Sequence, residues 1–235
     1  MTETANPGEV NFVTDIETDD ANDGDSESID GIHRRLDDRG LSPQHHYVDQ
    51  GYVSGANLAH SAKRSVELKG PIARDTSSKP AGFKQADFVL DFEQQVATCP
   101  RGQTSVSWLP RPQPDGHVGA HVLFRLKCAS CPDRAVCAPG RSGRSLEVSP
   151  YYQEITARRQ EEQTEAFKEE MKHRPAIEGT LSEMVRKHGF RRARYRGKAK
   201  VRLQHLFTGA AVNLKRLARA LAAQRKEQRA MATGC

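Results

Sequence analysis

Two carboxylates and a long run of cations are the residues of this 235-residue chain that could do chemistry. Asp49 ends the stretch HHYVD, which has the composition of a short strand, and a glycine turn follows it. In α/β sheets, functional side chains gather at the carboxyl ends of strands. Glu178 precedes a segment in which almost every second residue is Arg or Lys. Carboxylates that hold Mg²⁺ or Mn²⁺ beside such a segment would suit phosphodiester chemistry, because the metal activates the attacking oxygen and stabilises the leaving one.

Each carboxylate also has an ordinary structural explanation. Asp often caps a turn, and a turn follows Asp49. Pro175 suits the first turn of a helix, where the carboxylate of Glu178 would meet the positive end of the helix dipole. Taken alone, neither residue distinguishes a structural role from metal binding. The cations that follow Glu178 in the sequence favour a metal site beside a polyanion.

The charge of the chain is divided unevenly along its length. Residues 1–50 hold thirteen Asp and Glu against three Lys and Arg, whereas residues 171–230 hold three against seventeen. Such a basic segment predicts binding to a phosphate backbone. A solvated helix face is the alternative, but the acids needed for i,i+4 pairs are mostly missing. The candidate DNA contacts are Arg174, Arg186, Lys187, Arg191, Arg192, Arg194, Arg196 and Lys198.

Four of the five cysteines are clustered: Cys99, Cys128, Cys131 and Cys137. A Cys-x2-Cys pair can bind a tetrahedral Zn²⁺, and the other two thiols could complete a Cys₄ site. A cytosolic setting disfavours disulfides, and bound zinc would supply folding energy that a small module cannot gain from burial. Reduced or redox-active thiols are the alternative, since the usual second Cys-x2-Cys pair is absent.

The composition predicts a polar, cytoplasmic protein. Hydrophobic residues make up 36% of the chain and aromatic residues 6%. The sequence has no stretch near the roughly 18 apolar residues of a membrane span, and its acidic first residues do not resemble a secretory signal.

Pattern changes along the chain predict four segments. Strand and helix patterns alternate over residues 1–74, and short strands with frequent Pro, Gly and Ser occupy 75–150. Helical patterns fill 151–230, and 231–235 is expected to be a disordered tail.

Individual elements follow from local signals. The expected strands are 10–18, 45–49 and 66–74, and the expected helices are 29–40, 56–65, 151–174, 177–189 and 199–228. Ser26 or Ser28 would cap the first helix and Gly40 would end it. The last helix carries a broad apolar stripe formed by Val201, Leu203, Leu206, Val212, Leu214, Leu217 and Leu221.

Three stretches together resemble bacterial insertion-sequence transposases of the DDE type. FVTDIETDDANDGD and IHRRLDDRGLSPQHHYVDQGYVSG resemble the second strand, the first helix and the strand of the second aspartate. VATCPRGQTSVSW and FRLKCASCPDRAVC resemble a cysteine-bearing insertion. IEGTLSEMVRKHGFRRARYRGKAKVRLQHLFTGAAVNLKRL resembles the glutamate helix and the closing helix. The resemblance covers nearly the whole chain.

This resemblance implies an α/β fold and assigns roles. The fold would be an incomplete RNase H-like domain, interrupted by a small β-rich cysteine-containing insertion and closed by C-terminal helices. Asp49 and Glu178 would be the second and third acidic ligands of Mg²⁺ or Mn²⁺, and Arg174 would contact a DNA phosphate or position the site. Met171 stands where related enzymes have a tyrosine.

The first aspartate of such a site has no clear counterpart. Glu3 and Asn6 lie nearest to its expected place, and Asn6 lacks the charge that a metal ligand needs. Asp15 and Asp19 lie on or after the second strand. We therefore expect a truncated chain that lacks its first strand, binds DNA weakly and is catalytically impaired.

The implied function of the intact family is DNA cleavage and strand transfer. Metal-activated water cuts a phosphodiester bond, and the freed 3′-OH attacks target DNA, with a homodimer as the expected transposition complex. The alternative is a non-catalytic, zinc-stabilised nucleic-acid-binding module in which both carboxylates are structural. A redox protein that uses Cys128 and Cys131 fits neither the acidic start nor the basic end.

Overall fold

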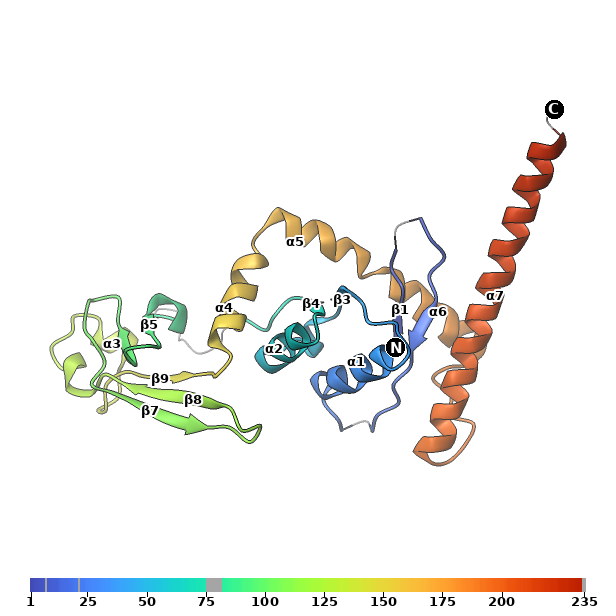
Figure 1. The fold of residues 1–235 in the computed structure, drawn as a ribbon. Helices are drawn as coiled ribbons and strands as arrows, with labels where there is room; N and C mark the ends of the chain where they lie inside the picture. The colour runs from blue at the N-terminus through green and yellow to red at the C-terminus, as the bar shows by residue number, and fades with distance from the viewer. Residues whose placement is uncertain (7, 21, 75–81, 234–235) are drawn as a thin grey trace. The chain divides into compact units, whose positions relative to one another are not determined.

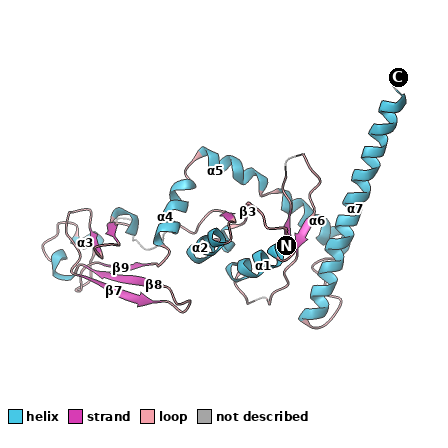
Figure 2. Cartoon of the chain, viewed as in Figure 1, coloured by secondary structure: helices cyan, strands magenta, loops and turns pink. Residues whose placement is uncertain are grey.

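The structure is a computed structural model that describes residues 1–6, 8–20, 22–74 and 82–233. Its contacts divide the chain into two compact units (Figure 1). Unit 1 comprises Met1–Val53, His60–Gly70 and Gln163–Cys235, and unit 2 comprises Ser54–Ala59 and Pro71–Glu162. Both units contain helices and strands (Figure 2), so the protein is a mixed α/β protein with small sheets.

Unit 1 contains two small sheets. Strand β1 (Thr2–Glu3) pairs antiparallel with β2 (Val13–Asp15), and β3 (His45–Tyr47) pairs parallel with β4 (Glu67–Lys69). β2 is shorter than the predicted strand 10–18, because its partner β1 has only two residues. The parallel pair is joined through helix α2 (Gly55–Lys63), as a parallel connection requires.

Helix α1 (Ile29–Asp37) forms where its apolar spacing predicted it. Ile29, Ile32 and Leu36 are buried, and Gly40 ends the segment at a φ of 65°. The predicted side-chain cap is wrong for Ser28. A 3-10 turn (η1, Asp25–Ser28) precedes the helix, and the Ser28 hydroxyl donates to the Asp25 carbonyl instead.

The predicted helix 151–174 is two helices. Helix α4 (Tyr152–Glu161) belongs to unit 2, and helix α5 (Glu165–Glu170) belongs to unit 1. The break has a local cause, because the Thr164 hydroxyl accepts the Phe167 amide at 3.2 Å and so begins a new helix. A 3-10 turn, η5 (Met171–His173), continues from α5.

Two further helices complete unit 1. Helix α6 (Ala176–His188) ends at Gly189, which is left-handed, and α7 runs from Lys198 to Thr233. α7 extends three residues into the predicted tail 231–235, since nothing in those residues breaks a helix; Gly234 and Cys235 lie outside the described residues. Within the described ranges, none of the helices has the length and apolar character to cross a bilayer.

Apolar contacts hold α6 and α7 to β2. Met184 of α6 and Val212 of α7 are fully buried against Ile16, which follows β2. Gly209 of α7 allows this approach, since a Cβ there would lie 2.7 Å from the Ile16 Cδ1. The glycine in the middle of this long helix therefore leaves room for the Ile16 side chain.

Polar contacts tie the same helices to the N-terminal strands. The Glu3 carboxylate, 3% exposed, accepts hydrogen bonds from the Thr180 hydroxyl at 2.5 Å and from Arg216 at 3.2 Å. The side-chain amide of Asn213 pairs with both the N–H and the C=O of Val13, at 2.8 Å each. A charge buried this deeply needs such partners, so Glu3 fixes the positions of β1, α6 and α7 relative to one another.

Unit 2 is mostly strands. β5 (Val89–Asp91) pairs with β6 (Val96–Thr98), and β7 (Ser107–Pro112), β8 (Val118–Leu123) and β9 (Ser145–Val148) form a three-stranded antiparallel sheet. The short helix α3 (Arg134–Cys137) and 3-10 turns η3 (Gln85–Asp87) and η4 (Arg125–Cys128) connect them. The core contains Phe88, Val122, Phe124 and Leu146. Unit 2 overlaps the predicted insertion 75–150 and includes α4 as well.

A pair of imidazoles lies between α1 and β3. Nε2 of His33, which is buried, is 2.8 Å from Nδ1 of His46. Burial, followed by the proximity of His33, lowers the pKa of His46 to about 3. Burial and then Arg64 lower the pKa of His33, and the Asp30 carboxylate opposes this only in part. Both rings are therefore neutral in the folded protein at ordinary pH.

This pair should make unit 1 sensitive to acid. The unfolded chain takes up a proton on each histidine below about pH 6.5, whereas the folded chain does not, so stability is full above that pH and falls as pH falls toward about 3. Between about pH 7 and about pH 5 we expect His46 to account for a loss of about 1–2 kcal/mol in the free energy of unfolding. Urea unfolding of His46→Gln should show a correspondingly flatter pH dependence than the wild type. Equal slopes in wild type and His46→Gln would contradict the account.

Candidate active site and nucleic-acid interface

Asp49 lies two residues beyond the carboxyl end of β3, which ends at Tyr47. The Val48 amide donates to the Lys69 carbonyl at 2.8 Å, which extends the pairing with β4. Gly70 permits the close approach, since a Cβ there would lie 2.6 Å from the Val48 carbonyl oxygen. A 3-10 turn, η2 (Gln50–Tyr52), follows, and the Asp49 side chain makes no capping hydrogen bond to it. The turn-capping explanation therefore does not account for this carboxylate.

Arg174 brings the two predicted carboxylates together. Its Nη1 donates to Oδ1 of Asp49, which is 125 residues away in the sequence. Its Nη2 lies 3.6 Å from Oε1 of Glu178, in the first turn of α6. All three residues belong to unit 1. The structure thus places one guanidinium against both carboxylates that the sequence singled out.

Stability alone does not explain this cluster. The side chains of Asp49 and Glu178 are each 64% exposed, and that of Arg174 is 30% exposed. Ion pairs as exposed as these contribute about 0–1 kcal/mol. The arrangement leaves two carboxylates accessible to a ligand beside a fixed cation.

Lys69 is a residue of this region that the sequence reasoning missed. Its side chain is 7% exposed and its ammonium pairs with Glu170 and, at 3.1 Å, with Glu67. Burial alone would lower the pKa of Lys69, but the hydrogen bonds that its ammonium donates to the two carboxylates outweigh burial and raise it. The Tyr47 and His173 rings are also in contact, with centroids 5.8 Å apart. These contacts attach the segment before Arg174 to β3 and β4.

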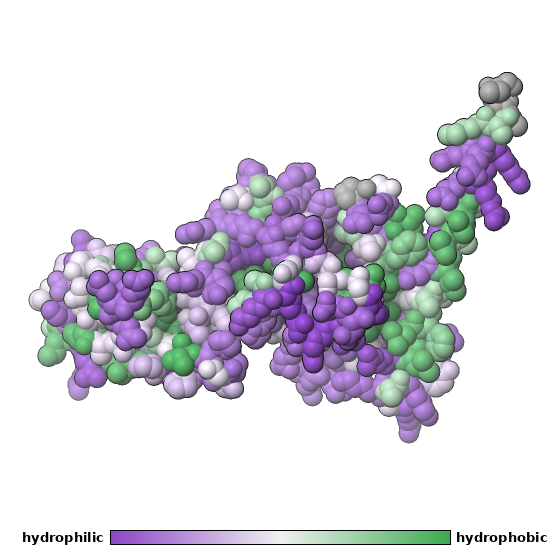
Figure 3. All heavy atoms as spheres, in the orientation of Figure 1, coloured by the Kyte–Doolittle hydropathy of each residue, from purple (hydrophilic) through white to green (hydrophobic). Residues whose placement is uncertain are grey.

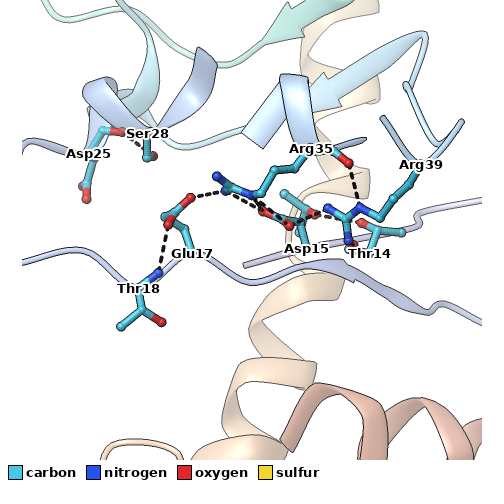
Figure 4. A network of polar contacts seen from close by, with 9 residues as sticks. Thr14, Asp15, Glu17, Thr18, Asp25, Ser28, Arg35 and Arg39 are labelled. Carbon is cyan, nitrogen blue, oxygen red and sulfur yellow. Dashed lines mark hydrogen bonds and ion pairs between the residues drawn. The ribbon is translucent and has the colours of Figure 1, made fainter. Parts of the chain in front are cut away.

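The other acids near the N-terminus are engaged elsewhere. Asp15 accepts from Arg35 at 2.8 Å and from Arg39 at 2.6 Å, and Arg35 also pairs with Glu17 (Figure 4). Burial would raise the pKa of Asp15, but the hydrogen bonds from the two arginines hold it below its ordinary value. Asp15 is therefore a buried structural ion.

Glu3, Asn6 and Asp19 do not supply a third ligand either. Glu3 is buried against Thr180 and Arg216, and the Asn6 amide donates to Glu9 at 2.8 Å. Burial and then the Glu17 charge raise the pKa of Asp19. The described residues contain no group of three or more His, Cys, Asp or Glu side chains that could hold a metal ion.

The predicted DNA contacts beyond Arg174 lie on one exposed segment. We call residues 186–198 the basic connector; it leaves the last turn of α6 and leads into α7. All of its arginines and lysines are exposed. Gln204 of α7 holds the connector, since it accepts the Arg194 amide at 2.9 Å and donates to the Arg192 carbonyl at 2.8 Å. The cations are thus presented from a backbone fixed at several points.

The four clustered cysteines are free thiols in unit 2. Cys99, Cys128 and Cys137 pack against the core of that unit, and the Arg144 amide donates to the Cys128 sulfur at 3.4 Å. Burial raises the pKa of Cys137, Arg144 opposes this, and the other three thiols add to the increase. The cysteines therefore share one neighbourhood without converging on a common point.

Comparison with known proteins identifies the family. Residues 98–218, slightly more than half of the chain, match the family model described as Transposase DDE domain. The matched range includes Arg174, Glu178, the four cysteines and the basic connector, and Asp49 precedes it. Searches of curated proteins and of solved structures returned no match. The match agrees with the resemblance in the sequence, and the chain belongs to the transposase DDE domain family.

Proposed function

We propose that Asp49 and Glu178 hold a divalent metal ion, Mg²⁺ or Mn²⁺, for the cleavage and joining of DNA by a DDE transposase of RNase H-like fold. The observation that carries this proposal is the single guanidinium of Arg174 against both carboxylates. The family acts on DNA and uses divalent metal ions, and Asp49 and Glu178 are the two exposed carboxylates that the sequence singled out as ligands. A cytoplasmic place of action is part of the same proposal.

The residues present fit a weakly bound metal. Carboxylate oxygens are the ligands that Mg²⁺ prefers, and this ion is often held by one or two carboxylates together with water and substrate phosphates. When bound, it would activate the attacking oxygen and stabilise the leaving oxygen of a phosphodiester. Arg174 would hold the two carboxylates in place and donate to a phosphate oxygen as DNA approaches.

Two carboxylates are fewer than the three of the family's acidic site. The buried carboxylates of Glu3 and Asp15 are each paired with arginine, so turning either toward Asp49 would break those ion pairs. We propose that this chain, by itself, binds DNA and is impaired in cleavage.

Metal binding tests the pair directly. Electron paramagnetic resonance should detect a Mn²⁺ site that Asp49→Asn and Glu178→Gln each weaken by about tenfold or more, since each removes a charged ligand. Glu227→Gln removes an exposed acid of α7 and should change nothing. Equal Mn²⁺ binding in all four proteins would rule out the proposed ligands.

Cleavage tests the expected impairment. Purified chain incubated with supercoiled plasmid and Mg²⁺ is expected to leave the DNA intact, because the described residues bring two carboxylates to the site and not three. Mg²⁺-dependent nicking that disappears in Glu178→Ala would contradict the expected impairment and would leave the metal-binding role of Glu178 intact.

DNA binding by the basic connector has a quantitative signature. Each phosphate contact contributes about 0.9 to the slope of log affinity against log salt concentration. The pair Arg191→Gln and Arg192→Gln should therefore reduce the slope by up to about 2. Lys127→Gln with Arg141→Gln, an equal loss of charge on exposed residues of unit 2, should leave the slope unchanged. A reduction of similar size in both double variants would show that only the net charge matters.

The second candidate is a non-catalytic nucleic-acid-binding module stabilised by zinc. The shared neighbourhood of the four cysteines supports it, and so does an ion pair between Arg101 and Asp133 that joins the segment of Cys99 to that of Cys131. Zinc would require the thiols to turn toward one another as they lose their protons.

A metal assay decides on zinc. The proposal expects about one zinc per chain, lost together with part of the thermal stability in Cys128→Ser and retained in Cys235→Ser. Purified wild-type protein with no zinc and four titratable cluster thiols would end the zinc proposal. DNA binding that survives Asp49→Ala and Glu178→Ala, with no divalent metal bound, would favour the non-catalytic module.

A further inference from the structure

Helix α7 has two faces of different character. One face packs on the rest of unit 1 through the buried Val212, through Asn213 and through Arg216, which contacts Glu3. The opposite face is exposed and apolar. In Figure 3 hydrophobic residues run along most of the length of α7, and polar residues cover its C-terminal part.

Six residues on the exposed face follow a regular spacing. We call them the α7 seam: Leu203, Phe207, Ala210, Leu214, Leu217 and Leu221. Successive members are separated by four, three, four, three and four residues, which is the a/d spacing of helices that pack by knobs into holes. The five large side chains are 45–67% exposed, and Leu206 beside them is 43% exposed. A helix of matching length is the partner that this spacing fits.

Charge argues against a nucleic acid or an acidic partner on this face. Among the described residues from 203 to 221, Arg219 is the exposed charged side chain, and it lies outside the seam. Lys215 and Arg216 are directed to Glu183 and Glu3 on the other face. The seam therefore offers a partner nothing but apolar contact.

The available area fits a stable pair of chains. The seam is about 27 Å long at about 1.5 Å per residue. With Leu206 and the neighbouring alanines it offers on the order of 600–800 Å² of apolar surface, close to the roughly 800 Å² per partner of a standard interface. An apolar patch of this size, above the few hundred Å² usual for a monomer, indicates an interaction site.

We propose that the α7 seam is a homodimer interface in which α7 packs antiparallel against α7 of a second copy. The spacing reads the same in both directions, so a two-fold axis between Ala210 and Leu214 matches every member with another. Leu203 then faces Leu221 of the partner subunit, Phe207 faces Leu217 of the partner subunit, and Ala210 faces Leu214 of the partner subunit. The small alanine opposite a leucine lets the helices approach closely, and the antiparallel arrangement also opposes the two helix dipoles. The proposal does not depend on the metal or DNA site.

Sedimentation equilibrium of the full chain tests the interface. Wild type is expected to be a dimer whose dissociation constant rises by about 30-fold or more in Leu214→Glu, as for a central buried contact. Arg219→Glu introduces the same charge on the same helix outside the seam and should remain dimeric. A wild-type monomer at all concentrations would overturn the proposal, because the seam would then be covered by another partner or by none.

A matched pair of substitutions tests the orientation and guards against misfolding. Leu203→Glu alone should favour the monomer, and Leu203→Glu with Leu221→Lys should restore the dimer in a salt-sensitive way, because opposite charges face each other only in the antiparallel arrangement. Restoration shows that the double variant folds, and circular dichroism checks the helix content of the single variant. A double variant that stays monomeric would refute the antiparallel interface, as would a dimer that Leu203→Glu and Leu214→Glu leave unchanged.

Discussion

The position of α6 depends on one buried carboxylate. Glu3 lies on a two-residue strand, accepts from Thr180 of α6 and pairs with Arg216 of α7. A charge that is 3% exposed cannot be left without partners, so β1, α6 and α7 hold one relative placement. Thr180 lies two residues after Glu178. The contacts that pair the Glu3 carboxylate therefore also fix the helix turn that carries Glu178 of the candidate site.

A second set of contacts fixes the other half of the site. Asp49 follows β3, and the pairing of Val48 with β4 sets its backbone. The buried ammonium of Lys69 on β4 holds Glu170, a few residues before Arg174. Arg174 then spans from this segment to both Asp49 and Glu178. Exposed ion pairs contribute little to stability, whereas Lys69 and Glu3 are buried, so the groups of the candidate site are exposed and the contacts that position them are buried.

The sequence predicted much of this unit because the relevant signals are local. The spacing of Ile29, Ile32 and Leu36 predicted α1, and the strand before Asp49 and the helix after Pro175 were also predicted. The resemblance assigned Asp49, Arg174 and Glu178 to one site, but it did not predict that Arg174 contacts both carboxylates, and nothing in the spacing of residues 125 positions apart indicates proximity. The break at Thr164 was missed because mixed charge pairs continue across it. Lys69 was missed because a single charged residue in a short strand resembles an exposed edge position.

The central claim is that Asp49 and Glu178 bind one ion between them. Paramagnetic broadening of amide resonances by Mn²⁺ measures this most directly, because Gly51 follows Asp49 and Gly179 follows Glu178 in the sequence. We predict that the Gly51 and Gly179 amide signals broaden together at the same low Mn²⁺ concentration. Broadening of one signal without the other, or of neither before general surface effects appear, would contradict the claim.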